Sequence, residues 1–249
     1  DSYKFKAFEL FQKLLAFRDN DLMMHYGNPE LIPALIDAVL KLKQDLPASA
    51  LNSIILVNDG SHSGVTDSAL ETLLQEIPEA KLIEYPKNRG KGYAVRMGVK
   101  SSEADIQIYT DVDFPYVEES IVEFYSFLSS GQADVVVASR GDSYYDSLST
   151  FRRILSKSLR WLNGLLFGLK IKDTQGGLKG FNGAGKEIFV QTRVNRYLFD
   201  LEFIQKLSKT QLVLKPIDVE LKPDIVLPSP SPMVLLKELH NFIRLLIWR

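Results

Sequence analysis

In the first half of this chain, the hydrophobic positions alternate between two patterns. One is the spacing of three to four residues that is typical of an amphipathic helix, and the other is a short, nearly continuous apolar run. Near the start of the chain, Phe5, Phe8 and Phe11 fall at helical spacing, and four further segments follow the same rule. The expected helices cover residues 3–17, 31–42, 66–77, 93–100 and 116–129.

Between these helices lie short apolar runs rich in valine and isoleucine, which predict buried strands. Strands that alternate with helices and are apolar along their length indicate a mostly parallel sheet flanked by helices, which is an α/β fold. Ligands of such sheets bind outside the carboxyl ends of the strands. Asp59, Asp111 and Arg140 each come just after an expected strand. The expected strands cover residues 53–57, 81–85, 106–110 and 135–139.

The alternation ends near Thr150. Residues 151–169 predict a long helix, with leucines on one side and Arg153, Lys157 and Arg160 on the other. The later segments are expected to be a glycine-rich loop at 174–185, a helix near 198–208, strands at 212–214 and 217–221, and an apolar helix at 233–249. We divide the chain into an N-terminal helical extension (1–20), one α/β domain (21–222), and a proline-rich connector with a C-terminal amphipathic helix (223–249).

Composition narrows the class of protein. A chain of 249 residues with 45% hydrophobic and 24% charged residues is ordinary for a globular protein, which excludes disordered and collagen-like proteins. The 30 Lys and Arg residues against 31 Asp and Glu residues give a net charge of −1, so we expect no nucleic acid partner. Cysteine is absent, which excludes disulfides, cysteine zinc sites and thiol nucleophiles. No apolar run approaches the ~20 residues of a membrane span.

The pair Asp111 and Asp113 is the sharpest chemical feature. Two carboxylates two residues apart at the end of a strand can hold one divalent cation, and Mg²⁺ prefers one or two carboxylates together with substrate phosphates. The alternative is an acidic turn without a ligand, because aspartate is common where strands end.

Four other segments carry candidate chemistry. Asn58 and Asp59 form a loop that can accept hydrogen bonds from a nucleoside, and the glycines around Lys91 suit a phosphate at a helix start. The loop from Asp173 to Phe181 has three glycines that allow a ligand to approach the backbone, with Lys179 beside them. The alternative is an Asx turn for the first loop, which taken alone it fits better, an exposed turn for the second and a mobile surface loop for the third. Asp200 and Glu202 are two residues apart on an expected helix, so we expect one to face the site and the other solvent.

Together, and in this order, the segments resemble family 2 glycosyltransferases with a GT-A, Rossmann-like fold, in particular those that act on polyprenyl or dolichyl phosphates. The family's Asp-Asp-Gly-Ser corresponds to Asn58–Ser61, and its Asp-x-Asp metal site to Asp111–Asp113. The remaining matches are Asn88–Gly92 to Asn-x-Gly-Lys-Gly, Ala138–Arg140 to Gly-Ser-Arg, Phe151–Arg153 to the Arg-Arg helix, Asp173–Lys179 to Asp-Thr-Gln-Cys-Gly-Phe-Lys, and Phe199–Glu202 to Phe-Asp-x-Glu.

The resemblance implies an inverting, metal-dependent hexosyltransferase that moves a sugar from a UDP- or GDP-linked donor to a polyprenyl phosphate. It implies Mg²⁺ or Mn²⁺, held by Asp111 and Asp113. The catalytic residues would be Asp113, Asp200 and Glu202, and the acceptor phosphate would meet Arg140, Arg152, Gln175 and Lys179. The nucleotide sugar would meet Tyr26, Asn28, Asn58, Asp59, Lys91 and Asp111.

The chain departs from the family at several donor positions. Asn28 replaces an expected Glu, Asn58 and Ser63 replace Asp, and Pro115 replaces a Gln that contacts the metal in mannosyl members. Two alternatives therefore stay open: a family 2 enzyme with a glycan hydroxyl as acceptor, which would need a general base, and a non-catalytic paralogue that acts as a binding module.

A lipid acceptor requires contact with a membrane. Residues 151–172 contain six Lys or Arg residues and no Asp or Glu, which suits an anionic bilayer surface, although a core helix with a solvated basic face explains it equally well. The helix at 233–249 is amphipathic and suits the same interface, although packing on the domain or self-association explains it equally well. We expect a peripheral protein at the cytoplasmic face of a membrane.

Overall fold

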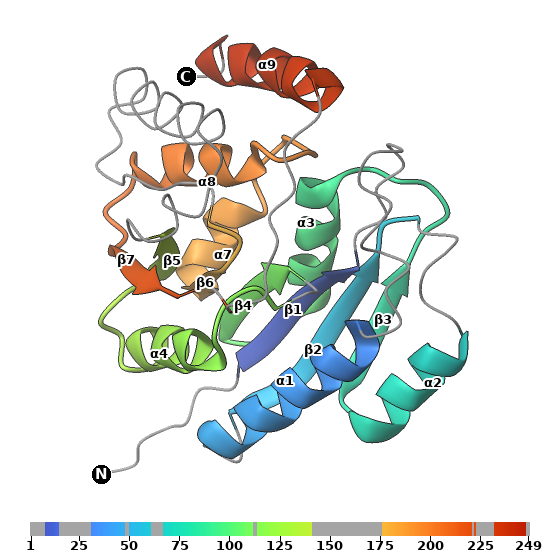
Figure 1. Cartoon of the computed structure of the whole chain (residues 1–249). Coiled ribbons are helices and arrows are strands. Elements are labelled where there is room, and N and C mark those ends of the chain that lie inside the picture. The colour runs from blue at the N-terminus through green and yellow to red at the C-terminus, as the bar shows by residue number, and fades with distance from the viewer. Residues whose placement is uncertain are drawn as a thin grey trace.

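The computed structural model contains a seven-stranded sheet between two layers of helices (Figure 1). The order of the strands is β3-β2-β1-β4-β6-β5-β7. All neighbours are parallel except β6, which runs antiparallel to both β4 and β5. The structure describes residues 8–14, 31–47, 50–60, 67–111, 114–140, 176–220, 222 and 232–247.

The expected α/β class is confirmed by these elements. The strands are β1 (Phe8–Leu14), β2 (Leu51–Asn58), β3 (Ala80–Glu84), β4 (Ile106–Asp111), β5 (Val135–Arg140), β6 (Lys179–Asn182) and β7 (Leu214–Val219). The helices are α1 (Leu31–Asp45), α2 (Asp67–Glu76), α3 (Lys91–Ser101), α4 (Glu118–Ser129), α7 (Gly183–Phe189), α8 (Phe199–Leu207) and α9 (Pro232–Ile247).

Both faces of the sheet are buried, as the continuous apolar strands predict. In β2, Ile54 and Leu56 join the core beneath α1, α2 and α4, whereas Ile55 and Val57 join the core beneath α3, α7, α8 and α9. Successive side chains of a strand point to opposite faces, so a strand buried on both sides must be apolar throughout.

The N-terminal segment differs from the prediction. Residues 8–14 form β1 in the middle of the sheet, paired with β2 and β4, instead of part of a helix over 3–17. Apolar residues at every second and every third position fit either period, and pairing with two neighbouring strands decides for the strand. The division at residue 20 is therefore wrong, because it places a central strand outside the domain.

The expected glycine-rich loop at 174–185 also contains regular structure. β6 and the start of α7 occupy residues 179–185. A Cβ on Gly180 would lie 2.9 Å from Leu128 of α4 and 3.0 Å from Ile108 of β4, so glycine here allows close packing of α4 on the sheet. The glycine marks a tight helix–sheet contact, which a sequence pattern cannot distinguish from a turn.

The C-terminal helix is confirmed as α9, which packs on α8. Phe242 and Leu245 are buried in the second core, and Gln205 of α8 donates to the carbonyl of Leu245. Glu238 also faces inward, where it accepts the N–H of Leu198 at 3.1 Å. Burial raises the pKa of Glu238. Among the residues that the structure describes, no helix is both long enough and apolar enough to cross a bilayer.

Candidate active site

Two loops meet at the carboxyl ends of β2 and β3. Gly60 has a φ of 78°, and a Cβ on it would lie 2.6 Å from the backbone nitrogen of Asn88, so the loops touch through their backbones. Asp59, fully buried, accepts the N–H of Arg89 at 2.8 Å and of Gly90 at 2.9 Å, one on each carboxylate oxygen. Asp59 therefore holds the glycine loop in place from behind.

Further polar side chains lie beside these two loops. Asn58, half-buried, donates to Glu84 at 3.1 Å. Burial, and to a lesser extent the Asp59 carboxylate, raise the pKa of the Tyr85 phenol, which therefore stays protonated. The Arg89 guanidinium lies 3.8 Å from the centre of the Tyr93 ring.

The glycine loop leads into α3 and brings two predicted donor residues together. Lys91, the first residue of α3, places its Nζ 2.6 Å from Oδ1 of Asp111 at the end of β4. Gly90 and Gly92 allow this approach, because a Cβ on either would lie within 2.5 Å of a carbonyl in the loop at 194–195. A cation and a carboxylate at the start of a helix form a surface to which a diphosphate with a metal ion can bind.

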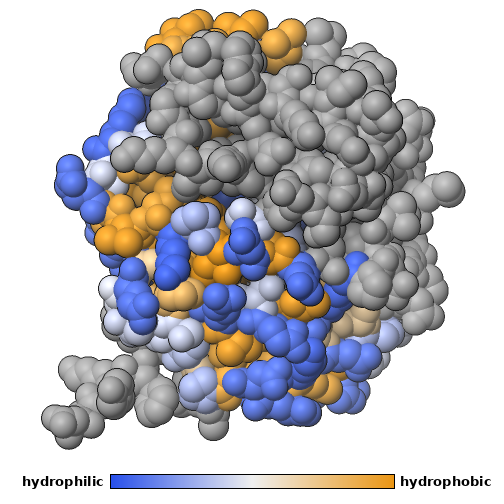
Figure 2. All heavy atoms as spheres, turned by 60° about the vertical axis from the view of Figure 1, so that its left-hand side comes forward, coloured by the Kyte–Doolittle hydropathy of each residue, from blue (hydrophilic) through white to orange (hydrophobic). Residues whose placement is uncertain are grey.

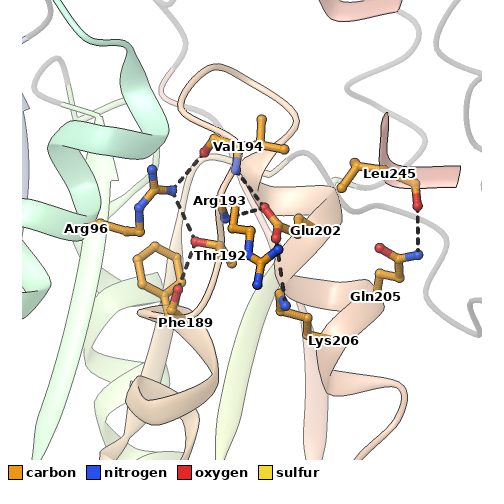
Figure 3. Close-up of polar contacts among 9 residues, drawn as sticks. All are labelled: Arg96, Phe189, Thr192, Arg193, Val194, Glu202, Gln205, Lys206 and Leu245. Atoms are coloured by element: carbon orange, nitrogen blue, oxygen red, sulfur yellow. Dashed lines mark hydrogen bonds and ion pairs between the residues drawn. The ribbon is translucent and has the colours of Figure 1, made fainter. Parts of the chain in front are cut away.

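Glu202 fixes that supporting loop (Figure 3). One of its carboxylate oxygens accepts the N–H of Arg193 at 2.7 Å and of Val194 at 2.8 Å. From the other side, Arg96 of α3 donates to the carbonyl of Val194 at 2.8 Å and to the hydroxyl of Thr192 at 3.2 Å. The loop below the Lys91 region is therefore held by two oppositely charged, buried side chains.

Asp200 belongs to a second buried group. Its Oδ1 accepts the Tyr109 hydroxyl at 2.5 Å and lies 2.9 Å from Nζ of Lys179. Asp200 and Glu202 are 3% and 2% exposed, so the expectation that one of them faces solvent is wrong. They lie two residues apart and point to different partners, and both partners lie inside the protein. Burial and the Asp200 carboxylate raise the pKa of Tyr109.

Two glycines of the segment before β6 lie against the end of β4. A Cβ on Gly177 would lie 2.6 Å from Oδ2 of Asp111, and the Gly177 N–H donates to the Tyr116 hydroxyl at 2.9 Å. A Cβ on Gly176 would lie 2.5 Å from the carbonyl of Ala138 in β5. The absence of side chains here leaves the Asp111 carboxylate accessible beside bare backbone.

The backbone of Phe114 is fixed close to the end of β4. Phe114, buried and with a φ of 45°, donates its N–H to the carbonyl of Asp111 at 3.1 Å. The backbone of Lys222 donates to the carbonyl of Pro115 at 2.9 Å, which ties this residue to the segment after β7. A left-handed backbone is costly for phenylalanine, so the surrounding packing has to hold Phe114 in this conformation.

The remaining predicted site residues are described only in part or lie outside the described residues. For Arg140 the structure gives the backbone, as the last residue of β5. The expected basic helix at 151–169 and the departures at Asn28 and Ser63 also lie outside the described residues. The same is true of five predicted site residues: Tyr26, Asn28, Asp113, Arg152 and Gln175.

Tyr109, Tyr116 and Arg96 lie in none of the motifs that the sequence offers as candidate sites. A signal for Tyr109 exists: residues two apart on a strand share a face, so Tyr109 had to lie on the same side of β4 as Asp111. Arg96 is a cation within the otherwise apolar face of α3, a pattern that indicates a buried partner.

Comparison with known proteins agrees with this arrangement. The sequence profile of "Glycosyl transferase family 2" matches residues 22–190, which is more than half of the chain. The chain belongs to glycosyl transferase family 2. The structure places Lys91 and Asp111, two residues of this matched range, in contact.

Curated relatives carry one name. The chain is similar to dolichyl-phosphate beta-glucosyltransferase of Drosophila melanogaster, with 28% identity over 207 residues, which cover 78% of this chain and 64% of that protein. The enzyme of the same name from Homo sapiens is 28% identical over 193 residues, covering 72% of this chain and 59% of that protein. The chain thus spans less than two thirds of the length of these relatives.

Solved structures share the fold. The chain superposes on glucosyl-3-phosphoglycerate synthase from Mycobacterium tuberculosis, in complex with UDP, with a TM-score of 0.63 and 13% identity, covering 97% of this chain and 79% of that one. A second structure of that enzyme, with Mn²⁺, UDP and glucosyl-3-phosphoglycerate, gives a TM-score of 0.61 at 15% identity, covering 97% and 77% of the two chains. The GT-A fold expected from the sequence is confirmed.

The residues at the end of β4 fit a divalent cation. Asp111 offers hard oxygen ligands, and the missing Cβ of Gly177 leaves space beside Oδ2. Within the described part of the chain no cluster of three or more His, Cys, Asp or Glu side chains occurs.

Proposed function

We propose that this chain transfers a sugar from a nucleoside diphosphate donor to a polyprenyl phosphate, with inversion at the anomeric carbon. The observation that carries the proposal is the contact between Lys91 and Asp111, beside Gly177, at the carboxyl end of β4. Its similarity to the dolichyl-phosphate beta-glucosyltransferases supports a lipid phosphate as acceptor.

On the donor side, Lys91 would move from Asp111 to the diphosphate when the donor binds. Asp111 and Asp113 would hold Mg²⁺ or Mn²⁺, which supplies positive charge to the leaving diphosphate. Asp59 contributes by fixing the N–H groups of Arg89 and Gly90, and Asn58 remains a predicted contact to the nucleoside.

On the acceptor side, Arg140, Arg152 and Gln175 remain the predicted contacts to the lipid phosphate. A phosphate monoester is largely ionised near neutral pH, with a second pKa of about 6, so it attacks without a strong general base. A hydroxyl acceptor would need one, and the carboxylates of Asp200 and Glu202 are already engaged by buried partners. This engagement favours the lipid phosphate over the hydroxyl.

The proposal is tested by incubating the chain with radiolabelled UDP-glucose or GDP-mannose and a polyprenyl phosphate in detergent. We expect label in the lipid fraction, dependent on Mn²⁺ or Mg²⁺, and a rise in melting temperature with the productive donor plus metal, because the donor binds the folded state. Label in a glycan fraction alone would show a hydroxyl acceptor. Neither transfer nor a melting shift with either donor at millimolar concentration would favour the non-catalytic paralogue.

We also propose that α9 contacts the membrane that carries the acceptor, at its cytoplasmic face. Leu239, Ile243 and Ile247 are 54%, 49% and 74% exposed and lie four residues apart on the outer side of α9. Figure 2 shows apolar residues gathered at the upper edge of the molecule, where Figure 1 places α9.

Charge favours a bilayer as the occupant of this face. Glu238, the one acidic residue of α9, is turned inward, with Oε1 3.4 Å from Nε of Arg196. The outer side carries Arg244 beside the apolar stripe, which suits an anionic leaflet. α9 also packs on α8, so a bilayer on this face would lie against the α/β domain. The basic segment 151–172 remains a predicted second contact.

Vesicle binding tests this surface. Changing Leu239, Ile243 and Ile247 together to asparagine is expected to reduce binding to vesicles of phosphatidylcholine and phosphatidylglycerol by at least about tenfold, because each apolar side chain buried in the interface contributes on the order of 1 kcal/mol. Leu74→Asn, at an exposed leucine of α2, is the matched control and should bind like the wild type. A dimer in sedimentation that the triple variant dissociates, with unchanged vesicle binding, would instead show a second copy as the partner.

A further inference from the structure

Lys179 is a lysine without access to solvent. Its exposed fraction is 0%, and β6 places it opposite Tyr109 in the register with β4. Nζ lies 2.9 Å from Oδ1 of Asp200 and donates to the carbonyl of Gly176 at 2.5 Å. A fully buried ammonium is tolerated because a carboxylate neutralises it and hydrogen bonds satisfy its protons.

The group around Lys179 is closed on all the described sides. Tyr109 donates to the same oxygen of Asp200 at 2.5 Å, and its ring packs against Phe181, Phe189 and Phe199. One positive and one negative charge cancel in this apolar layer. The ammonium is buried, and it donates a hydrogen bond to the Gly176 carbonyl.

That carbonyl belongs to the segment that lies against Asp111. Gly177 follows Gly176 directly, and its Cα faces Oδ2 of Asp111. The segment has a second attachment at Gly177, whose N–H donates to Tyr116 at 2.9 Å. Lys179 and Tyr116 thus hold the two polar ends of one peptide group, the carbonyl of Gly176 and the N–H of Gly177, from two different parts of the chain.

We propose that Lys179, neutralised by Asp200, is a positioning residue that sets the Gly176–Gly177 backbone against Asp111 for sugar transfer. In this role Lys179 does not bind the acceptor phosphate and Asp200 does not act as a general base. The inference rests on the proposed function, because it concerns the geometry of that transfer site. Displacement of groups around a reacting centre by about 1 Å can lower a rate by about 100-fold.

Single substitutions in the pair are poor tests, since each leaves one buried charge without its partner. The double variant Lys179→Met with Asp200→Leu removes both charges and keeps an apolar volume, so it is expected to fold. We expect its kcat to fall by roughly 10-fold to 100-fold, as for a lost second layer around a metal ligand. The KM for polyprenyl phosphate should stay unchanged, and the pH dependence of kcat should keep its shape.

Tyr116→Phe is the second variant, because it removes one hydrogen bond from the same segment. It should lower kcat on its own, and its effect should not add to that of the double variant, since both release one segment. Tyr125→Phe, at a buried tyrosine of α4, is the matched control. Without metal or donor, amide hydrogen exchange in the peptide covering residues 176–182 should accelerate in both test variants and not in the control.

The outcomes separate the roles. A raised KM for the lipid phosphate with unchanged kcat would show that Lys179 binds the acceptor, and loss of the acidic limb of the pH profile would show that Asp200 is a base; either overturns the inference. Full activity of the double variant, or additive effects with Tyr116→Phe, would overturn it too. Should the double variant not fold, Tyr116→Phe decides alone. Absence of transfer by the wild type would instead reject the proposed function.

Discussion

Replacing Asp111 with asparagine is expected to lower kcat/KM for sugar transfer by about 100-fold or more, because the amide gives up the charge that would hold the divalent cation. The fold should lose little. The Lys91–Asp111 ion pair is partly exposed, and such pairs contribute about 0–1 kcal/mol to stability. The measurement is transfer at saturating Mn²⁺, together with the metal-dependent melting shift in the presence of donor, which should disappear.

Asp105→Asn is the matched control for this experiment. Asp105 is exposed and lies just before β4, so the same substitution is made at the opposite end of the same strand. It should leave transfer and the melting shift unchanged. Equal losses in the two variants, or full activity of Asp111→Asn, would show that the carboxylate at the end of β4 has no special part in the reaction.

The second large effect is expected at Asp59, on stability first and on donor binding as a consequence. Asp59→Asn should lower the free energy of unfolding by about 2–4 kcal/mol, because the new amide group would face a buried backbone N–H where the carboxylate accepts one. The loop from Arg89 to Lys91 would lose its support from behind, so the KM for the donor should rise. Denaturant unfolding and donor kinetics below the melting point measure the two effects.

Asp134→Asn is the control variant that separates the effect on stability from the effect on donor binding. The Asp134 carboxylate also accepts two hydrogen bonds, from the Asn182 amide at 2.8 Å and the Val213 N–H at 2.7 Å. Asp134, however, lies just before β5, at the amino end of that strand. Asp134→Asn should destabilise the fold and leave the KM for the donor unchanged. A destabilised Asp59→Asn variant with a normal KM would show that the glycine loop does not depend on Asp59.

Much of the fold follows from local patterns. The strands from β2 to β5 and the helices from α1 to α4 are predicted by periodicity, because their burial on fixed faces imposes it. β1 is missed because the apolar residues of Phe8–Leu14 satisfy two periods, and only pairing with β2 and β4 selects one. β6 is missed because Gly180 is required by contact with Leu128, a constraint that comes from an element 50 residues earlier.

Of the candidate site, too, one part can be predicted from the sequence and another part cannot. Placement just after strands predicts that Asp59 and Asp111 lie at the carboxyl ends of β2 and β4, and the structure places them there. The direction in which a carboxylate points cannot be predicted from its place at the end of a strand. It depends on which hydrogen-bond donors surround the carboxylate in the folded chain. Asp59 faces backbone N–H groups, Asp200 faces Lys179 and Tyr109, and Glu202 faces a loop. Each of these partners lies far away in the sequence or outside any motif.

The reversed direction of β6 has a consequence for how such a protein can diversify. β5 ends and β6 begins at the same edge of the sheet, where Val137 pairs with Lys179, so the chain between them leaves and returns at neighbouring points. The entropy of closing such an excursion changes slowly with its length. A change in the length of the chain between β5 and β6 is therefore expected to cost the fold little. The strands of the sheet, and the contact between Lys91 and Asp111, would stay as they are.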